Sequence, residues 1–293
     1  MNLGIFDVVG PIMHGPSSNH TGGVNRIGTI SRQIMGGCPK QIHIGLHPAL
    51  MVNYTGQRTH TAMVAGLLGI RESDIECNEA LKLAQAKGIS WEVYPVEPEA
   101  SRNTMRASGI VNGVKWVVNG DSIGGGNILI DRINGMKVEI DGNSYEIVAI
   151  SEDSAILSQL KEYLFSLGMT KQWTEGTVKE GYLICGVFTF EPPDLEALPD
   201  KLRSEVLEGR LKYHTVVPLT TFCPKNSELP LFSSFAELEQ LCKKQDLISA
   251  IVQYECMRDD VTADEVWDEM RFTVDVMMDT LERGQNGSIS LIG

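Results

Sequence analysis

The sequence predicts an α+β fold throughout, because helical and strand-like segments are mixed without the regular β-α-β repeat of a parallel sheet. Two patterns carry this prediction. Apolar residues at spacings of three and four between Val24 and Ile34 predict an amphipathic helix that ends at Gly36. Between residues 107 and 150, alternating β-branched runs are separated by pairs typical of type I′ hairpin turns: Asn112-Gly113, Asn134-Gly135 and Asp141-Gly142.

The first segment, residues 1–143, is expected to form one mixed domain of helices and strands. The stretch from Gly10 to Ser18 is rich in glycine, serine and proline, and it predicts a loop. We predict strands at 3–9, 41–46 and 89–96, and helices at 59–68 and 74–87, the last of them capped by Ser73.

The second segment, residues 144–219, is expected to run β-α-β-β-α-β, the ferredoxin-like arrangement. Its second helix is predicted to begin at Pro192-Pro193-Asp194, because proline is preset for a first helical turn. The third segment, residues 220–293, is predicted to be a linker followed by helices. Thr262 and Glu265 have the spacing of a capping box, and the helix after them has an apolar, methionine-rich face that predicts a packing partner.

The composition excludes two classes of partner. A net charge of −13 in 293 residues opposes binding to a nucleic-acid backbone, and no apolar run reaches the roughly 20 residues that span a membrane. The six cysteines show no C-x-x-C spacing, and the N-terminus has no secretory apolar region. We therefore predict reduced thiols in a cytoplasmic protein, with no iron–sulfur or metal site built from this chain alone.

Residues 15–23, Gly-Pro-Ser-Ser-Asn-His-Thr-Gly-Gly, are the first candidate site. The side chains of Ser17, Ser18, His20 and Thr21 lie just before the predicted helix, where backbone N–H groups are unpaired. Hydroxyls, an imidazole and free amides together suit a ligand carboxylate. The alternative is purely structural: Ser18 or Asn19 caps the helix, and His20 lies on the surface.

Two further stretches could carry chemistry. In Ser122-Ile-Gly-Gly-Gly-Asn127, Gly124 and Gly125 would let the backbone approach a ligand closely, or they would simply make a wide turn. In Gly56-Gln-Arg-Thr-His60, the imidazole of His60 could act as a base, while Arg58 could hold a carboxylate. A capped helix with exposed polar residues would explain the second stretch equally well.

Taken together, these motifs resemble the β chain of the iron–sulfur-dependent L-serine dehydratase (serine ammonia-lyase) family. Phe6-Asp-Val-Val-Gly-Pro-Ile-Met13 and the 15–23 stretch resemble the family's opening, usually G-P-S-S-S-H-T-A-G. Arg102-Asn103-Thr104 resembles its N-T step, and Gly120-Asp-Ser-Ile-Gly-Gly-Gly126 its G-G-S-I-G-G-G loop. The second segment resembles an ACT domain, and the third resembles the first helices of the family's α chain.

The resemblance implies an ammonia-lyase of amino-acid metabolism that converts L-serine to pyruvate and ammonia. In that family a 4Fe–4S cluster polarises the leaving hydroxyl as a Lewis acid, and its cysteines lie in the later α region. The resemblance therefore implies an oligomer with an α-type subunit that carries the cluster, and no activity for this chain alone. It also implies that Ser17, Ser18, His20, Thr21, Asn103, Ser122, Gly124 and Gly125 bind a small amino-acid substrate.

One motif departs from the family pattern. The family usually reads G-H-G-T-D where this chain has Gly56-Gln-Arg-Thr-His60, so glutamine replaces the histidine and His60 stands at the aspartate position. Glutamine cannot act as a base, which leaves His60 as the candidate catalytic residue. Two alternatives remain open at this point: a non-catalytic regulatory protein that binds an amino acid or hydroxy acid, and a truncated piece of a fused dehydratase.

Overall fold

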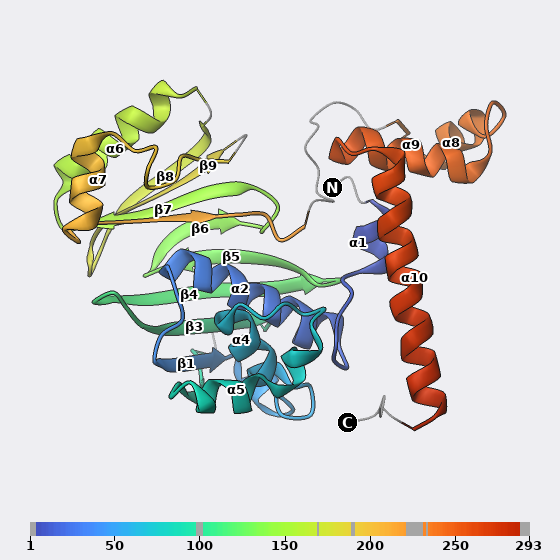
Figure 1. Cartoon of the computed structure of the whole chain (residues 1–293), viewed down its shortest axis with the longest axis horizontal. Helices are drawn as coiled ribbons and strands as arrows, with labels where there is room; N and C mark the ends of the chain where they lie inside the picture. Colours follow the sequence, from blue (N-terminus) through green and yellow to red (C-terminus); the bar gives the residue numbers. More distant parts are fainter. Residues whose placement is uncertain are drawn as a thin grey trace. The chain divides into compact units, whose positions relative to one another are not determined.

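The computed structural model describes residues 4–97, 102–168, 170–188, 191–220, 231–232 and 234–287. The chain divides into two compact units, and each is described by itself: residues 13–219 form one, while residues 1–12 and 220–293 form the other. The larger unit contains two β-sheets with helices (Figure 1), so the predicted α+β class is confirmed at this level.

The first sheet has six strands in the order β2-β1-β3-β4-β5-β6. Only β1 and β2 run parallel, and the other neighbours are antiparallel. The strands are β1 (Gln41–Leu46), β2 (Ser90–Pro95), β3 (Thr104–Val111), β4 (Val114–Gly124), β5 (Asn127–Ile133) and β6 (Met136–Ile140). The β3–β4 and β5–β6 turns have both central residues at positive φ, as predicted for Asn112-Gly113 and Asn134-Gly135.

Six helical segments accompany this sheet: η1 (Ser18–Gly23), α2 (Val24–Met35), α3 (Pro48–Met51), α4 (Thr59–Leu68), η2 (Ile75–Glu79) and α5 (Ala80–Ala86). Helix α2 packs on β3, β4 and β5, and α4 packs on α2. The two helices meet at Gly28 and Gly66, where a Cβ on Gly66 would lie 2.1 Å from the Asn25 carbonyl oxygen. This close approach holds the second half of α4 against the first half of α2, and the same helix carries His60 on its first turn.

The second sheet is antiparallel and has the strand order β10-β7-β9-β8. Its elements follow the predicted β-α-β-β-α-β order: β7 (Tyr145–Ser151), α6 (Ser154–Ser166), β8 (Thr170–Val178), β9 (Gly181–Phe188), α7 (Asp200–Leu207) and β10 (Leu211–Val216). Ile147 and Ala149 of β7 face a core shared with α6 and α7. Val148 and Ile150 join the core of the six-stranded sheet instead, so both faces of the second sheet are covered.

The smaller unit is helical, with α1 (Ile5–Val9), α8 (Phe235–Leu241), α9 (Leu247–Asp259) and α10 (Ala263–Gln285). The predicted capping box of Thr262 and Glu265 is confirmed at the start of α10. Val266 of the predicted apolar face is buried, whereas Val274, Met277 and Leu281 are exposed. No helix in the described residues combines the length and the apolar character that crossing a membrane requires.

Four predictions about local structure were wrong. Within the run 3–9 that was predicted to be a strand, residues 5–9 form helix α1, and the amide of Ile5 donates to the buried Glu255 carboxylate at 2.7 Å. The turn at Asp141-Gly142 links the two sheets instead of closing a hairpin, and only Gly142 has positive φ. The last two concern helix boundaries and are explained next.

The predicted helix 74–87 splits into η2 and α5, and Asp74 rather than Ser73 occupies the first cap position. Helix α7 begins at Asp200 instead of Asp194. The Asp194 carboxylate accepts a hydrogen bond from the Ala197 amide and closes a local turn. The proline-rich segment therefore forms a turn, and Pro199 is the residue that directly precedes the helix.

Candidate functional site

The segment that was predicted to bind a carboxylate forms a short π-helical turn, η1, directly before α2. Ser17 caps it: its hydroxyl accepts the His20 amide at 3.1 Å, and its carbonyl accepts the amides of Thr21 and Gly22. The sequence predicted that these amides would be free to bind a ligand, but they donate hydrogen bonds to Ser17 within the turn. Ser18 is exposed, His20 is half-buried and Thr21 is buried.

Two contacts bring the predicted motifs together in the larger unit. The Thr21 hydroxyl donates to the carbonyl of Gln57 at 2.9 Å, which joins η1 to the segment leading into α4. A Cβ on Gly23 would lie 2.5 Å from the hydroxyl of Ser122, so η1 also lies directly on β4. Residues from three distant parts of the sequence thus meet at one place.

The glycine run and the N-T step lie at the same end of the sheet. Gly125 and Gly126 are the central residues of the β4–β5 turn, and a Cβ on Gly124 would meet open space. The Gly126 carbonyl accepts from Arg26 of α2 at 3.3 Å, which ties this turn to the helix. Asn103 directly precedes β3, whose first residue pairs with Asp121, the neighbour of Ser122.

The strongest feature of this place is a group of buried polar atoms that make no hydrogen bond within the described part of the chain. They belong to the three segments just joined: Asn19 Oδ1, Gln57 Oε1, His60 Nδ1 and Ser122 Oγ. We call these four residues the polar cluster. Ser122 is 3% exposed. Buried polar atoms are rarely left unpaired, so the cluster is suited to a ligand that supplies the missing partners.

His60 stands on the first turn of α4, with its ring edge-on to Tyr54 at a centroid distance of 5.1 Å. Burial lowers the pKa of His60 below its usual value, and the backbone of Tyr54 partly opposes that shift. The imidazole is therefore neutral at physiological pH. A neutral ring can accept a proton or share one hydrogen bond at each nitrogen.

Arg58 has an unusual backbone next to the cluster. Its φ of 55° and ψ of 25° are left-handed, a conformation that costs a non-glycine residue about 1 kcal/mol. Its guanidinium donates to the Asn78 side chain at 2.6 Å. Arg58 is exposed, and Arg26 of α2 is paired with Glu72 at 2.7 Å.

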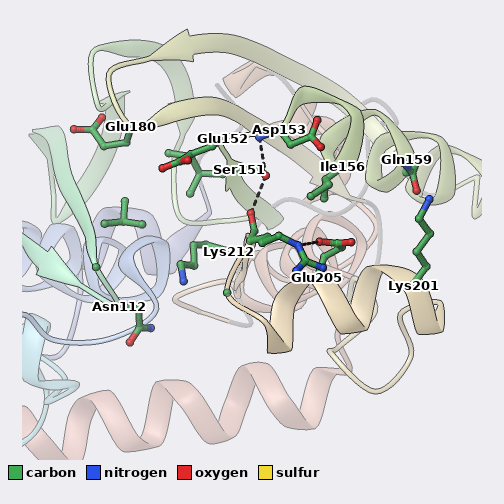
Figure 2. Close-up of a pocket in the computed structure, with 15 residues that line it drawn as sticks. Asn112, Ser151, Glu152, Asp153, Ile156, Gln159, Glu180, Lys201, Glu205 and Lys212 are labelled. Atoms are coloured by element: carbon green, nitrogen blue, oxygen red, sulfur yellow. Dashed lines mark hydrogen bonds and ion pairs between the residues drawn. The ribbon is translucent and has the colours of Figure 1, made fainter.

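A cavity lies elsewhere in the larger unit, and none of the four residues of the polar cluster lines it. Figure 2 shows this cavity of about 670 Å³, with Ser151 and Asp153 on one side and Lys201 and Glu205 of α7 on the other. Its polar groups bind one another: the Ser151 hydroxyl donates to the Arg210 carbonyl, and the Asp153 carboxylate caps α6. None of the residues that line it carries a buried polar side-chain atom without a hydrogen bond.

The described residues do not fit an iron–sulfur cluster or another metal. No three of their histidine, cysteine, aspartate and glutamate side chains gather in a way that could hold an ion. The buried thiols of Cys77 and Cys185 have pKa values raised by desolvation, which disfavours the thiolate form that ligates iron. Cys223 lies outside the described residues.

Among the predicted site residues, the structure thus gathers His60, Ser122 and the η1 residues at one place, and it leaves Gly124 and Gly125 in an exposed turn. Sequence reasoning missed Asn19 and Gln57 as binding residues, although both side chains carry unpaired buried atoms.

Comparison with known proteins gives two relatives. The chain is 34% identical over 154 residues to the probable L-serine dehydratase β chain of Bacillus subtilis (strain 168), which covers 51% of this chain and 68% of that one. It is 30% identical over 164 residues to the L-serine dehydratase β chain of Peptoniphilus asaccharolyticus, covering 54% and 73%. No family model matches the sequence.

Proposed function

Because this chain belongs to the L-serine dehydratase β-chain family, we propose that it is the β-type subunit of a lyase that eliminates water from L-serine. The resulting 2-aminoacrylate tautomerises to an imine, which water hydrolyses to pyruvate and ammonia. Within this lyase, the chain itself binds the carboxylate of a small 3-hydroxy acid at the polar cluster. The chain by itself is inactive in this proposal, since it needs groups that a second subunit supplies.

The unsatisfied atoms of Asn19, Gln57, His60 and Ser122 are the observation that carries this proposal. The two side-chain amides can present either an oxygen or an NH2 group, and the serine hydroxyl can donate. Together with the half-buried His20 they form a small set of polar groups against the buried faces of α2 and β4. A small number of polar groups placed in this way fixes the orientation of a small ligand.

The relatives are named β chains, and such a name supports a second, α-type subunit in the assembly. We propose that this subunit carries the 4Fe–4S cluster, because the described residues of this chain do not offer a suitable set of ligands. The exposed apolar side chains of α10, including Met277 and Leu281, are the proposed docking surface for it. The assembly would be cytoplasmic, where its thiols stay reduced.

We propose that residues 144–219 are an ACT-like domain, within a division of the chain at 1–143, 144–219 and 220–293. The β-α-β-β-α-β order and the strand order β10-β7-β9-β8 support a ferredoxin-like topology for that part.

The role of His60 in turnover is tested by His60→Asn in the complex with an α-type subunit. A base must lie within about 3 Å of the proton it removes, directly or through one water. If His60 is the base, the variant loses about 100-fold or more in kcat while ligand affinity is kept. Burial lowers the pKa of His60. As the pH is lowered, the wild-type rate should therefore begin to fall only at pH values below the usual titration range of histidine.

The observation that favours a second candidate is Gln57, which replaces the histidine of the family pattern and cannot transfer protons. In that case the chain is a non-catalytic, ligand-binding regulatory subunit. An unchanged rate for His60→Asn, or a wild-type complex that binds ligand without turnover, would favour this candidate over the first.

A further inference from the structure

Helix α10 exposes apolar side chains at a regular spacing (Figure 1). Trp267, Val274 and Leu281 are 39%, 47% and 55% exposed, and they recur every seven residues. Residues seven apart lie on nearly the same side of an α-helix, because about seven residues make two turns. Met277 and Met278 are also exposed and widen this row between its last two members. We call these five residues the apolar stripe.

The side of α10 that is buried within the chain is a different one. Val266 and Thr273 are also seven residues apart, and both are buried. Each of them directly precedes a residue of the apolar stripe, which places it about 100° around the helix from that residue. The packing of α10 in the described part of the chain therefore leaves the apolar stripe uncovered.

A row of acidic residues borders the apolar stripe. Asp268, Asp275 and Glu282 each directly follow a residue of the stripe, so they also recur every seven residues. Asp268 is paired with Arg271 at 2.5 Å. The carboxylates of Asp275 and Glu282 form no ion pair with any residue that the structure describes. We call these three residues the acidic row.

The charge of the whole helix determines which partner suits this surface. Helix α10 contains seven aspartate and glutamate residues but only two arginines. Both arginines are already used on the helix itself, Arg271 with Asp268 and Arg283 with Asp279 at 2.8 Å. A second copy of this helix, or an anionic lipid surface, would be repelled by the acidic row. A helix with lysine or arginine beside its apolar residues would instead pair with the row.

We propose that the apolar stripe and the acidic row together bind an amphipathic helix of the α-type subunit. The apolar residues of that helix recur at spacings of three and four, and lysine or arginine residues flank them. The inference rests on the proposed role of α10 in docking this subunit, and it specifies the chemistry of the partner segment. From residue 267 to residue 281 the stripe is about 21 Å long, which matches about two heptads of a partner helix.

Two synthetic helical peptides test the charge preference without the α-type subunit. Both have the same leucine heptads, and they differ only in carrying lysine or glutamate at the flanking positions. Fluorescence anisotropy with the full chain should give a Kd for the lysine peptide at least about tenfold lower than for the glutamate peptide. The variant Asp275→Lys/Glu282→Lys should remove this preference. The control Glu162→Lys/Glu191→Lys makes the same change of net charge at two exposed positions of the larger unit and should keep it.

The complex with the α-type subunit tests whether that subunit uses this surface. The variant Val274→Ser/Leu281→Ser should raise the Kd of the complex by about tenfold or more, because the partner helix loses its apolar contacts. The control Val52→Ser/Leu207→Ser makes the same chemical change at two exposed positions of the larger unit, and it should leave this Kd unchanged. Circular dichroism of each variant checks that the helices are still formed.

The possible failures are distinguishable. Equal affinity of the wild-type chain for the two peptides would overturn the basic partner helix. A complex with the α-type subunit that Val274→Ser/Leu281→Ser does not weaken would overturn the docking surface while keeping the proposed subunit role. A dimer of the chain alone that this variant dissociates would assign the stripe to a second copy and overturn the inference. If the wild-type chain did not bind the α-type subunit, the proposed subunit role and the inference would fail together.

Discussion

At the scale of single residues, Ser122 shows how a binding site differs from a packed core. Its side chain is almost fully buried on β4, yet its hydroxyl has no partner among the described residues. A buried hydroxyl without a partner costs roughly 1–3 kcal/mol. The chain holds this group in place through Gly23, whose missing side chain leaves room for the Ser122 hydroxyl.

Substituting Ser122→Ala should therefore separate stability from binding. The free energy of unfolding should stay the same or rise by up to about 1 kcal/mol, because the unsatisfied hydroxyl is removed. The affinity for the carboxylate ligand should fall. Urea unfolding and calorimetric titration of the same preparation measure the two effects.

The matched control is Ser108→Ala, whose buried hydroxyl donates to the His43 carbonyl at 3.3 Å. That variant should lose about 1 kcal/mol of stability and keep its affinity. If Ser122→Ala destabilised the chain as much as Ser108→Ala and left binding intact, the Ser122 hydroxyl would be a structural group.

The sequence allowed His60 and Ser122 to be singled out, because each lies in a short motif of a resembled family. It did not allow Gln57 and Asn19 to be recognised as binding residues, since nothing local distinguishes a capping amide from one facing a ligand. Their unpaired atoms depend on the meeting of η1, β4 and the start of α4, which are far apart in the chain.

At the scale of elements, the contact between α2 and α4 positions the helix that carries His60. Both helices lack a side chain where they cross, so their backbones come within van der Waals contact. The long periodic segments that make these helices were predictable, as was α4 from residue 59 to residue 68. Helix α1 at residues 5–9 was not, because the amide at its start is bound by a carboxylate 250 residues away.

Substituting Gly66→Ala should destabilise the chain by at least about 2 kcal/mol, because the new Cβ would overlap the Asn25 carbonyl oxygen. It should also weaken ligand binding, since α4 carries His60. Gly56→Ala is the control: its Cβ would meet only the flexible end of the Asn53 side chain. Equal melting temperatures for the two variants would show that the helices do not need this close contact.

Strand β7 contains a second charge-sensitive position, the buried Glu146. Desolvation, with a smaller contribution from Asp141, raises its pKa from 4.5 to about 8, while a hydrogen bond from Cys185 opposes the shift. Between these pH values the folded chain keeps a proton that the unfolded chain has lost. The stability contributed at this position therefore falls as the pH rises from about 4.5 to 8.

The variant Glu146→Gln should remove most of this pH dependence, which is on the order of a few kcal/mol between pH 5 and pH 8. Urea unfolding at the two pH values measures it, with the exposed Glu162→Gln as control. If the Glu146→Gln chain lost as much stability as the wild type between pH 5 and pH 8, the raised pKa of Glu146 would not be the source of the pH dependence.

At the scale of the whole molecule, two features support the proposal that the chain works within an assembly. Helix α10 exposes Phe272, Met277 and Leu281 along its length. The relatives of the chain are named as β chains. The net charge of −13 opposes binding to a nucleic-acid backbone. It does not prevent a protein partner from covering an apolar helix face.

The central claim is that this chain is a lyase subunit that acts with an α-type partner. It is tested most directly by anaerobic co-expression of the full chain with an α-type subunit, followed by gel filtration, iron analysis and turnover assays with L-serine. We predict one co-eluting complex that contains iron and releases pyruvate, with no turnover from the chain alone. An α-type subunit that elutes separately and turns over the same substrate equally fast without this chain would contradict the claim.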